Sequence, residues 1–263
     1  MGQIEGYKVV VTACSEASIA GLAGAAVRRV AREGAQVTLV SPAGKAGAAL
    51  AASIGAGKAR HIESPLQGFD KAVTSAAQQM GGLDALVNVV QPETPWQSFV
   101  QKGTAGFTPA FDGLNAAVGA MQAAWPYLQK RGEGARVVNV GSVYGASSYA
   151  HVADSVLSDY ALQGLTRAVA VEWAPSGVRV NHLGPGALDV PEFKRWRATH
   201  AAAVDHRVGS LAMRRLGSPD EDFGGALMLL LSDEGCFLVG QTVYADGGQH
   251  LVAPVLEPGV PLA

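Results

Sequence analysis

The sequence predicts a doubly wound α/β fold in which a seven-stranded parallel sheet carries helices on both faces. Short β-branched runs alternate with longer alanine-rich segments, a pattern typical of βαβ units. Most of these runs are apolar throughout, as parallel strands covered on both faces must be. The chain has 263 residues, of which 48% are hydrophobic and 16% charged, so it can bury the core that such a sheet needs.

The elements follow one another at the spacing of crossover connections. Strands are expected at 7–13, 35–40, 58–62, 83–90, 135–141, 177–183 and 241–245. Crossover helices are expected at 18–33, 66–80, 108–131, 152–174 and 219–232. Because no linker, repeat or low-complexity tract interrupts this series, we expect one domain over residues 1–250. A Pro-rich tail, 251–263, follows it.

Composition excludes several classes of partner. A formal net charge of -2 gives no electrostatic reason to expect nucleic acid or an anionic membrane. The sequence has no basic segment followed by an apolar run at its start and no apolar stretch long enough to span a bilayer, so we expect a cytoplasmic protein. Cys14 and Cys236 lie far apart without Cys or His at metal-ligand spacing, which excludes a disulfide framework and a metal site.

Three stretches carry a family resemblance: "GLTRAVAVEWAPSGVRVNHLGPG" at 164–186, "RRLGSPDED" at 214–222 and "FLVGQTVYADGG" at 237–248. Weaker matches are "GGLDALVN" at 81–88 and "RVVNVGSVYG" at 136–145. Together they resemble the short-chain dehydrogenase/reductase family over nearly the whole chain. The resemblance implies a Rossmann-type sheet that binds NAD(H) or NADP(H), a Ser with a Tyr-x-x-x-Lys pair acting on an alcohol or ketone, and usually a tetramer.

The first turn departs from the family pattern. Ala13 and Ala17 stand where two glycines let the pyrophosphate approach backbone N–H groups, and a register one residue longer ends the turn with 18–20, again without glycine. Glu16 would bring a carboxylate into the anion site, where it could itself cap the helix N-terminus. Alternatively, Glu16 points to solvent and the longer turn still accepts a dinucleotide.

Other cofactor positions are also altered. Ser41 and Pro42 stand where the family has an acidic residue for the adenosine ribose or an Arg for the 2′-phosphate of NADP, and the usual Asp after the third strand is absent. Of the Asn-Asn-Ala-Gly motif only Asn88 remains, while Pro185 and Gly186 keep the family residues after the sixth strand. We therefore expect no cofactor, or weakly held NAD(P).

The catalytic positions follow from counting. Ser142 matches the family serine, and thirteen residues later the tyrosine position holds Ser155, with Asp159 at the lysine position. Without that tyrosine and lysine the hydride chemistry lacks its acid–base group, so Ser142 is interpreted as a relic and Ser155 and Asp159 as non-functional. Tyr160 lies five positions past the tyrosine position and is expected to pack in the helix bundle through which family members assemble.

Three functions remain open. In the first, the chain is a pseudoenzyme that supports an active NAD(P)-dependent paralogue. It assembles with that paralogue, or with itself, through the helix 154–172 and the strand region 237–248, as a tetramer. The family includes such pairs in the breakdown of aromatic compounds to CoA thioesters.

The second is an atypical NAD(P)-dependent oxidoreductase for a hydroxy or keto substrate, with Tyr160 or Tyr149 replacing the missing tyrosine. The third is a small-molecule binding protein that uses the vacant cleft. A new hydrolytic site of Ser142, His151 and Asp154 is disfavoured, because the last two are neighbours in sequence rather than convergent from separate loops.

Overall fold

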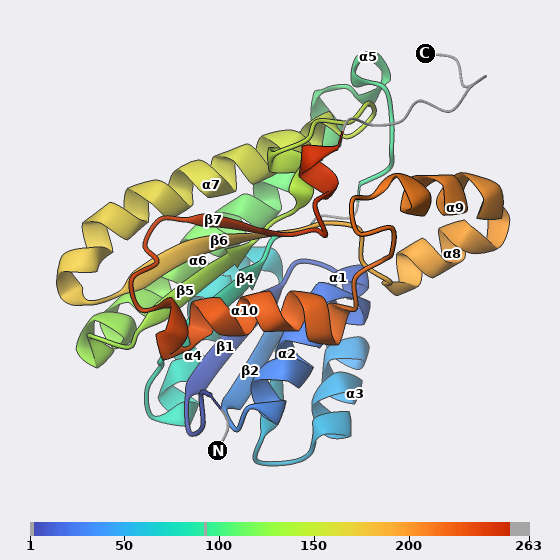
Figure 1. The fold of residues 1–263 in the computed structure, drawn as a ribbon. Coiled ribbons are helices and arrows are strands. Elements are labelled where there is room, and N and C mark those ends of the chain that lie inside the picture. Colours follow the sequence, from blue (N-terminus) through green and yellow to red (C-terminus); the bar gives the residue numbers. More distant parts are fainter. Residues whose placement is uncertain (1–2, 92–93, 253–263) are drawn as a thin grey trace.

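The computed structural model describes residues 3–91 and 94–252 and confirms the parallel sheet (Figure 1). Seven strands form one sheet in the order β3-β2-β1-β4-β5-β6-β7, and every neighbouring pair is parallel. The strands are β1 (Lys8–Ala13), β2 (Gln36–Ser41), β3 (Ala59–Glu63), β4 (Ala85–Val89), β5 (Arg136–Val140), β6 (Arg179–Pro185) and β7 (Thr242–Ala245). The strand order reverses direction between β1 and β4, the point at which sheets of this kind bind ligands.

Helices cover both faces of the sheet, as expected (Figure 1). The helices are α1 (Glu16–Ala20), α2 (Leu22–Arg32), α3 (Gly44–Ile54), α4 (Phe69–Met80), α5 (Phe99–Lys102), α6 (Thr108–Arg131), α7 (Ala153–Trp173), α8 (Pro191–Thr199), α9 (Ala201–Ser210) and α10 (Gly224–Leu231). One core cluster packs α2, α3 and α10 on one face of the sheet, and a second packs α4, α6 and α7 on the other. None of the described helices has the length and apolar character that a membrane span requires.

Several helices differ from expectation. The segment expected as one helix at 18–33 is divided at Gly21 into α1 and α2, and α3, α5, α8 and α9 occupy regions where no helix was expected. In α3, Gly44 and Gly47 lower the helix propensity, yet a Cβ at Gly44 would collide with the Glu63 carboxylate and one at Gly47 with the His61 ring. Tertiary packing, invisible in the local pattern, therefore requires both glycines. The expected tail begins at 251, and residues 253–263 lie outside the described residues.

A buried polar ladder crosses the centre of the sheet. Thr12 Oγ1 on β1 donates to Asn88 Oδ1 on β4 (3.0 Å), and Asn88 Nδ2 donates to Asn139 Oδ1 on β5 (3.0 Å). Asn139 Nδ2 then donates to Thr166 Oγ1 on α7 (2.9 Å). All four side chains are buried, so each hydrogen bond satisfies groups that water cannot reach. The ladder thus ties α7 to the central strands through Asn139.

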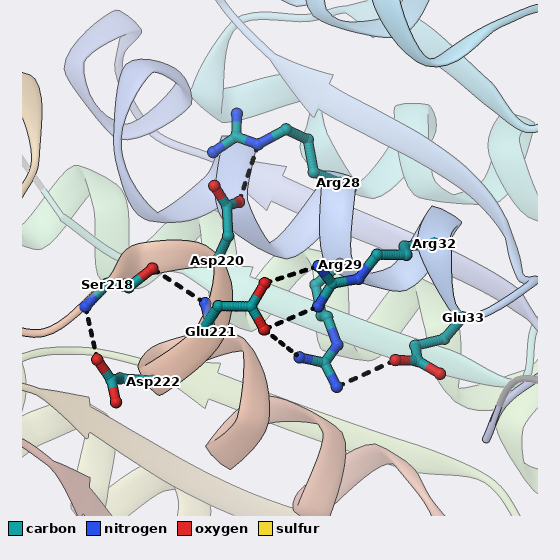
Figure 2. Close-up of polar contacts among 8 residues, drawn as sticks. All are labelled: Arg28, Arg29, Arg32, Glu33, Ser218, Asp220, Glu221 and Asp222. Atoms are coloured by element: carbon teal, nitrogen blue, oxygen red, sulfur yellow. Dashed lines mark hydrogen bonds and ion pairs between the residues drawn. The ribbon is translucent and has the colours of Figure 1, made fainter.

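An exposed ion-pair cluster ties α2 to the turn that precedes α10 (Figure 2). Arg28 Nε lies 2.9 Å from Asp220, and Arg32 makes a two-pronged contact with Glu221 at 2.7 and 3.1 Å. Ser218 caps this turn by accepting a hydrogen bond from the Glu221 N–H. Ion pairs at such exposure contribute little individually, but together they fix where the segment after α9 returns to the sheet.

A buried ion pair joins α5 to the start of α7. Lys102 Nζ lies 2.5 Å from Asp154 Oδ1, and the two side chains are only 1% and 0% exposed. Burial raises the pKa of the Asp154 carboxyl, but hydrogen bonds from Lys102 and Thr94 outweigh it and leave the pKa below the ordinary value of 3.8. The pair therefore holds the loop after β4 against α7.

Replacing Asp154 by Asn should destabilise the fold by about 3–5 kcal/mol, because the Lys102 ammonium is left buried without its counter-charge. Urea unfolding followed by circular dichroism measures this loss. Since the folded-state pKa lies below the unfolded one, the wild-type stabilisation should persist above about pH 4 and disappear as the pH falls through the folded value. Asp205→Asn is the control, because its pair with Arg197 is exposed and should be worth at most about 1 kcal/mol. Equal losses in both variants would contradict the assignment.

Candidate functional site

A cleft of about 590 Å³ opens at the carboxyl ends of β1, β4, β5 and β6. Its walls are the loops that follow these strands, the start of α7, and helices α8 and α9, which project beyond the sheet in Figure 1. Its size is that of a small-molecule site, and it lies where doubly wound sheets bind their ligands. Ser142, Ser155 and Asp159, the three residues predicted from the catalytic spacing, all line it.

Asp159 turns a buried carboxylate toward the β5 loop. Its Oδ1 accepts hydrogen bonds from the Ser142 backbone N–H (2.7 Å) and from His182 Nε2 (3.2 Å), and its Oδ2 accepts one from Gln163 Nε2 (2.8 Å). The residue is only 3% exposed. Since a buried carboxylate is tolerated only when its oxygens are satisfied, these three donors account for its presence at the base of the cleft.

Two glycines make room for this carboxylate. A Cβ at Gly141 would collide with Asp159 Oδ1 and lie 2.7 Å from His182 Nε2. A Cβ at Gly145 would collide with Asp159 Oδ2 and with the Gln163 amide. The β5 loop and α7 therefore pack closely around this acidic group, and glycine is required at both 141 and 145.

The groups next to Asp159 do not form a catalytic triad. His182 contacts Asp159 from the side of the sheet, and its ring is fully buried. Ser142 Oγ instead accepts a hydrogen bond from the Tyr144 backbone N–H (3.1 Å), as the cap of a short helical turn. Tyr244 accepts from Gln163 at 3.3 Å, and burial raises the pKa of its hydroxyl, which makes it a poorer proton donor at neutral pH.

The other residues weighed as replacements lie apart from the three central ones. Tyr160 is 54% exposed and is not among the described residues that line the cleft. Tyr149 hydrogen-bonds Gln249 through its hydroxyl (3.0 Å). Asp154 is committed to Lys102, so the imagined set of Ser142, His151 and Asp154 is not assembled.

At the first turn, Ser15 caps α1. Its Oγ accepts a hydrogen bond from the Ser18 N–H (3.1 Å), while Glu16 is exposed and is not among the described cleft-lining residues. The expectation that Glu16 caps the helix is thus wrong, because the hydroxyl one residue earlier already occupies that position. Ala13 is buried at the end of β1 and Ala17 lines the cleft with its methyl group. Burial raises the pKa of the nearby Cys14 thiol to about 12, so it is not a nucleophile.

The adenosine end of a dinucleotide would lie over the ends of β2 and β3. Ser41 is fully buried there, and its hydroxyl is 3.0 Å from His61 Nε2. The Glu63 carboxylate packs against Gly44 at the start of α3. Among the described residues that line the cleft, none belongs to β2, α3 or β3.

The remaining cofactor positions have structural partners. Asn88 belongs to the polar ladder, and Pro185 and Gly186 line the cleft at the end of β6. A Cβ at Gly186 would collide with Asp246, so this glycine permits close packing of two loops. The first turn has no glycine at positions 13–20. At the end of β2, where the adenosine ribose would lie, the Ser41 hydroxyl is already hydrogen-bonded to His61. The residues present therefore fit a complete dinucleotide poorly.

Sequence reasoning did not anticipate four polar residues of the site: His182, Gln163, Arg195 and Arg207. Gln163 lies one helical turn after Asp159, a spacing that signals contact on a helix. His182, Arg195 and Arg207 come from separate elements and carried no signal in the sequence. Within residues 3–91 and 94–252, no three His, Cys, Asp or Glu side chains gather as a metal site.

Comparisons with known proteins agree with this fold. A family profile described as "Enoyl-(Acyl carrier protein) reductase" matches residues 16–250. The chain is 29% identical over 265 residues to the 3beta-hydroxysteroid dehydrogenase 1 of Eggerthella lenta, covering 94% of this chain and 95% of that protein. It is 30% identical over 240 residues to the human dehydrogenase/reductase SDR family member 4, covering 88% and 84%. A solved structure described as a short chain dehydrogenase/reductase family protein superposes with a TM-score of 0.81 at 28% identity, covering 95% of this chain and all of that one.

Gly141→Ala should destabilise the fold by about 1–3 kcal/mol, because the new methyl group collides with the Asp159 carboxylate. In an Asp159→Ala background the same change should cost at least about 1 kcal/mol less, since the obstacle is gone. Urea unfolding of the two single variants and the double variant gives this coupling. Gly209→Ala is the control, because nothing lies within 4 Å of its added methyl group. Strictly additive effects at 141 and 159 would show that the two positions do not share this space.

Proposed function

Because the chain belongs to the short-chain dehydrogenase/reductase family, we propose that it is a non-catalytic subunit that assembles with an active NAD(P)-dependent paralogue. Members of this family generally bind NAD(P) and act as oxidoreductases. In the proposed assembly the paralogue catalyses hydride transfer, and this chain contributes the family fold and the surfaces that contact the paralogue.

The observation that supports this proposal most strongly is the environment of Asp159. The family's tyrosine needs a nearby cation that lowers its pKa, and the family lysine supplies that cation. Here the matching position bears a carboxylate whose oxygens are engaged by Ser142, His182 and Gln163. The tyrosine position holds Ser155, whose alcohol does not exchange a proton at neutral pH in the way a phenol beside a lysine does. An acid–base group of the family type is therefore missing.

The alternative of an atypical oxidoreductase finds little support in the geometry. Tyr160 faces away from the cleft-lining set, and the Tyr149 hydroxyl is engaged by Gln249. The poor fit of the first turn and of the Ser41 end to a dinucleotide supports the same conclusion. We therefore propose that NAD(P) binds weakly or not at all to this chain.

Two exposed apolar surfaces support the assembly part of the proposal. The first, on α6 and α7, consists of Phe111, Leu157, Tyr160 and Val171, which are 46–77% exposed. The second includes Phe237, which is 96% exposed just before β7. Apolar side chains this exposed gain free energy when another chain covers them. Leu157, Tyr160 and Val171 fall in the region 154–172 and Phe237 falls in 237–248, the two regions that resemble the family's subunit contacts.

Restoring both catalytic residues should not restore catalysis. The variant Ser155→Tyr with Asp159→Lys should show no dehydrogenase turnover with NADH or NADPH and carbonyl substrates. The reasons are that a lysine at 159 would meet the Ser142 N–H and the Gln163 amide, which now donate to the Asp159 carboxylate, and that in this proposal the cofactor contacts remain absent. The absorbance of NADH or NADPH measures turnover, and circular dichroism verifies that the variant is folded. Turnover by this variant would show that the cofactor site is intact and would overturn the proposal.

The assembly should depend on the α7 surface. When tagged chain is co-expressed with family paralogues that retain the Tyr-x-x-x-Lys pair, Leu157→Asp should abolish co-purification of the active partner, because a carboxylate would be buried in the interface. Val100→Asp is the matched control, since Val100 is 91% exposed and lies on α5, outside 154–172 and 237–248. A stable homo-oligomer that ignores every such paralogue, or equal effects of both substitutions, would contradict the proposed partner.

A further inference from the structure

The cleft carries an excess of positive charge that its own walls do not neutralise. Two guanidinium groups line it, Arg195 on α8 and Arg207 on α9. Among the described residues that line it, Asp159 alone bears an acidic side chain, and its oxygens are already engaged by three donors. Among the described lining residues, an anion entering the cleft therefore meets two cations and no carboxylate that lacks hydrogen-bond donors.

Two other cations on α8, Lys194 and Arg197, differ from these arginines because each is paired with an acidic side chain. On the same helical pair, Lys194 lies 3.3 Å from Asp189 and Arg197 lies 2.6 Å from Asp205, and neither cation lines the cleft. Within the described residues, Arg195 and Arg207 have no acidic partner. The basic residues that face outward are thus neutralised within the chain, and the two that face the cleft are not.

Arg207 lies over the ring of Tyr149, whose hydroxyl contacts the buried Gln249. Its guanidinium carbon lies 5.2 Å from the centroid of the Tyr149 ring, and the Tyr149 hydroxyl is 3.0 Å from Gln249 Nε2. Gln249 is only 3% exposed and lines the cleft, yet its Oε1 has no hydrogen-bond partner. If the amide turns over, Oε1 accepts from the Tyr149 hydroxyl and the N–H₂ group becomes free to donate. A buried amide with one unsatisfied group, beside an unpaired arginine, needs an external polar partner.

Part of the cleft wall is apolar. Phe193 lines the cleft from α8 and is fixed by an edge contact with Trp196 at 5.5 Å. Tyr144 and Leu188 line the cleft from the loops after β5 and β6, and Trp96, 59% exposed, lies at its border. A ligand that fits this cleft therefore has an apolar body as well as a charged head.

From these observations we propose that the cleft binds a small organic anion, whose carboxylate or phosphate head pairs with Arg195 and Arg207 and whose apolar body packs against Phe193, Tyr144 and Leu188. Guanidinium groups bind both kinds of head through charge-assisted hydrogen bonds. Gln249 adds a donor once its amide turns over. The binding requires no nicotinamide and no proton transfer, so it does not depend on whether the chain is a non-catalytic subunit.

The test is isothermal titration of the whole chain with 4-phenylbutanoate, 4-phenylbutyl phosphate and the neutral 4-phenylbutanamide. We expect at least one of the two anions to bind, and to bind about tenfold or more tightly than the amide, because only the anions form charge-assisted hydrogen bonds with the arginines. The better of the two anions identifies the preferred head. This comparison uses the wild-type chain and so does not depend on the folding of any variant.

Substitutions then locate the site. Arg195→Gln and Arg207→Gln should each weaken binding of the preferred anion by about tenfold. Arg197→Gln, on the same helix but paired with Asp205, should leave binding unchanged. Thermal melting of each variant verifies its fold. Failure of both anions to bind at millimolar concentration, equal binding of the amide, or equal effects of all three substitutions would each overturn the proposal.

Discussion

The site is organised by one buried carboxylate. Asp159 on α7 accepts hydrogen bonds from the β5 loop, from β6 and from its own helix, and Gly141 and Gly145 leave space for it. Removing the acid would leave the Ser142 N–H without its acceptor and the Gln163 amide with the Tyr244 hydroxyl alone. A methyl group added at either glycine would collide with the carboxylate. The β5 loop, the start of α7 and the base of the cleft are therefore organised around an acidic side chain, at the position that we propose matches the family lysine.

The elements around this carboxylate are held together by interactions that serve packing. The ladder from Thr12 through Asn88 and Asn139 to Thr166 joins three strands to α7 and involves no ligand. The ion pairs between α2 and the turn before α10, drawn in Figure 2, set the return path of the segment that leaves α9. The Ser41 hydroxyl, at a position expected to face a cofactor, contacts His61 instead, and Ser15 in the first turn caps α1. A subunit that serves assembly alone would keep the family fold while losing the catalytic and cofactor-binding residues, as we propose for this chain.

The strands could be predicted from the sequence to within about two residues, because runs such as "KVVVTA" and "RVVNV" are apolar on both faces and occur only in covered parallel sheets. The helix α3 could not be predicted, because its two glycines are required by packing against His61 and Glu63 on β3. Counting residues brought Ser142, Ser155 and Asp159 into one cleft, but the partners of Asp159 come from β6 and from the next turn of its own helix. The sequence likewise could not show that Arg195 on α8 and Arg207 on α9 line the cleft without an acidic partner among the described residues, because this depends on where the two helices lie relative to the sheet.

The central claim is that this chain retains the fold of a nicotinamide enzyme without its cofactor site. Isothermal titration of the folded, isolated chain with NAD⁺, NADH, NADP⁺ and NADPH tests it most directly. The account predicts no saturable heat in the micromolar range for any of the four, because the β1 turn and the Ser41 end lack the groups that hold a dinucleotide. Micromolar binding of any one of them, at one equivalent per chain, would contradict it.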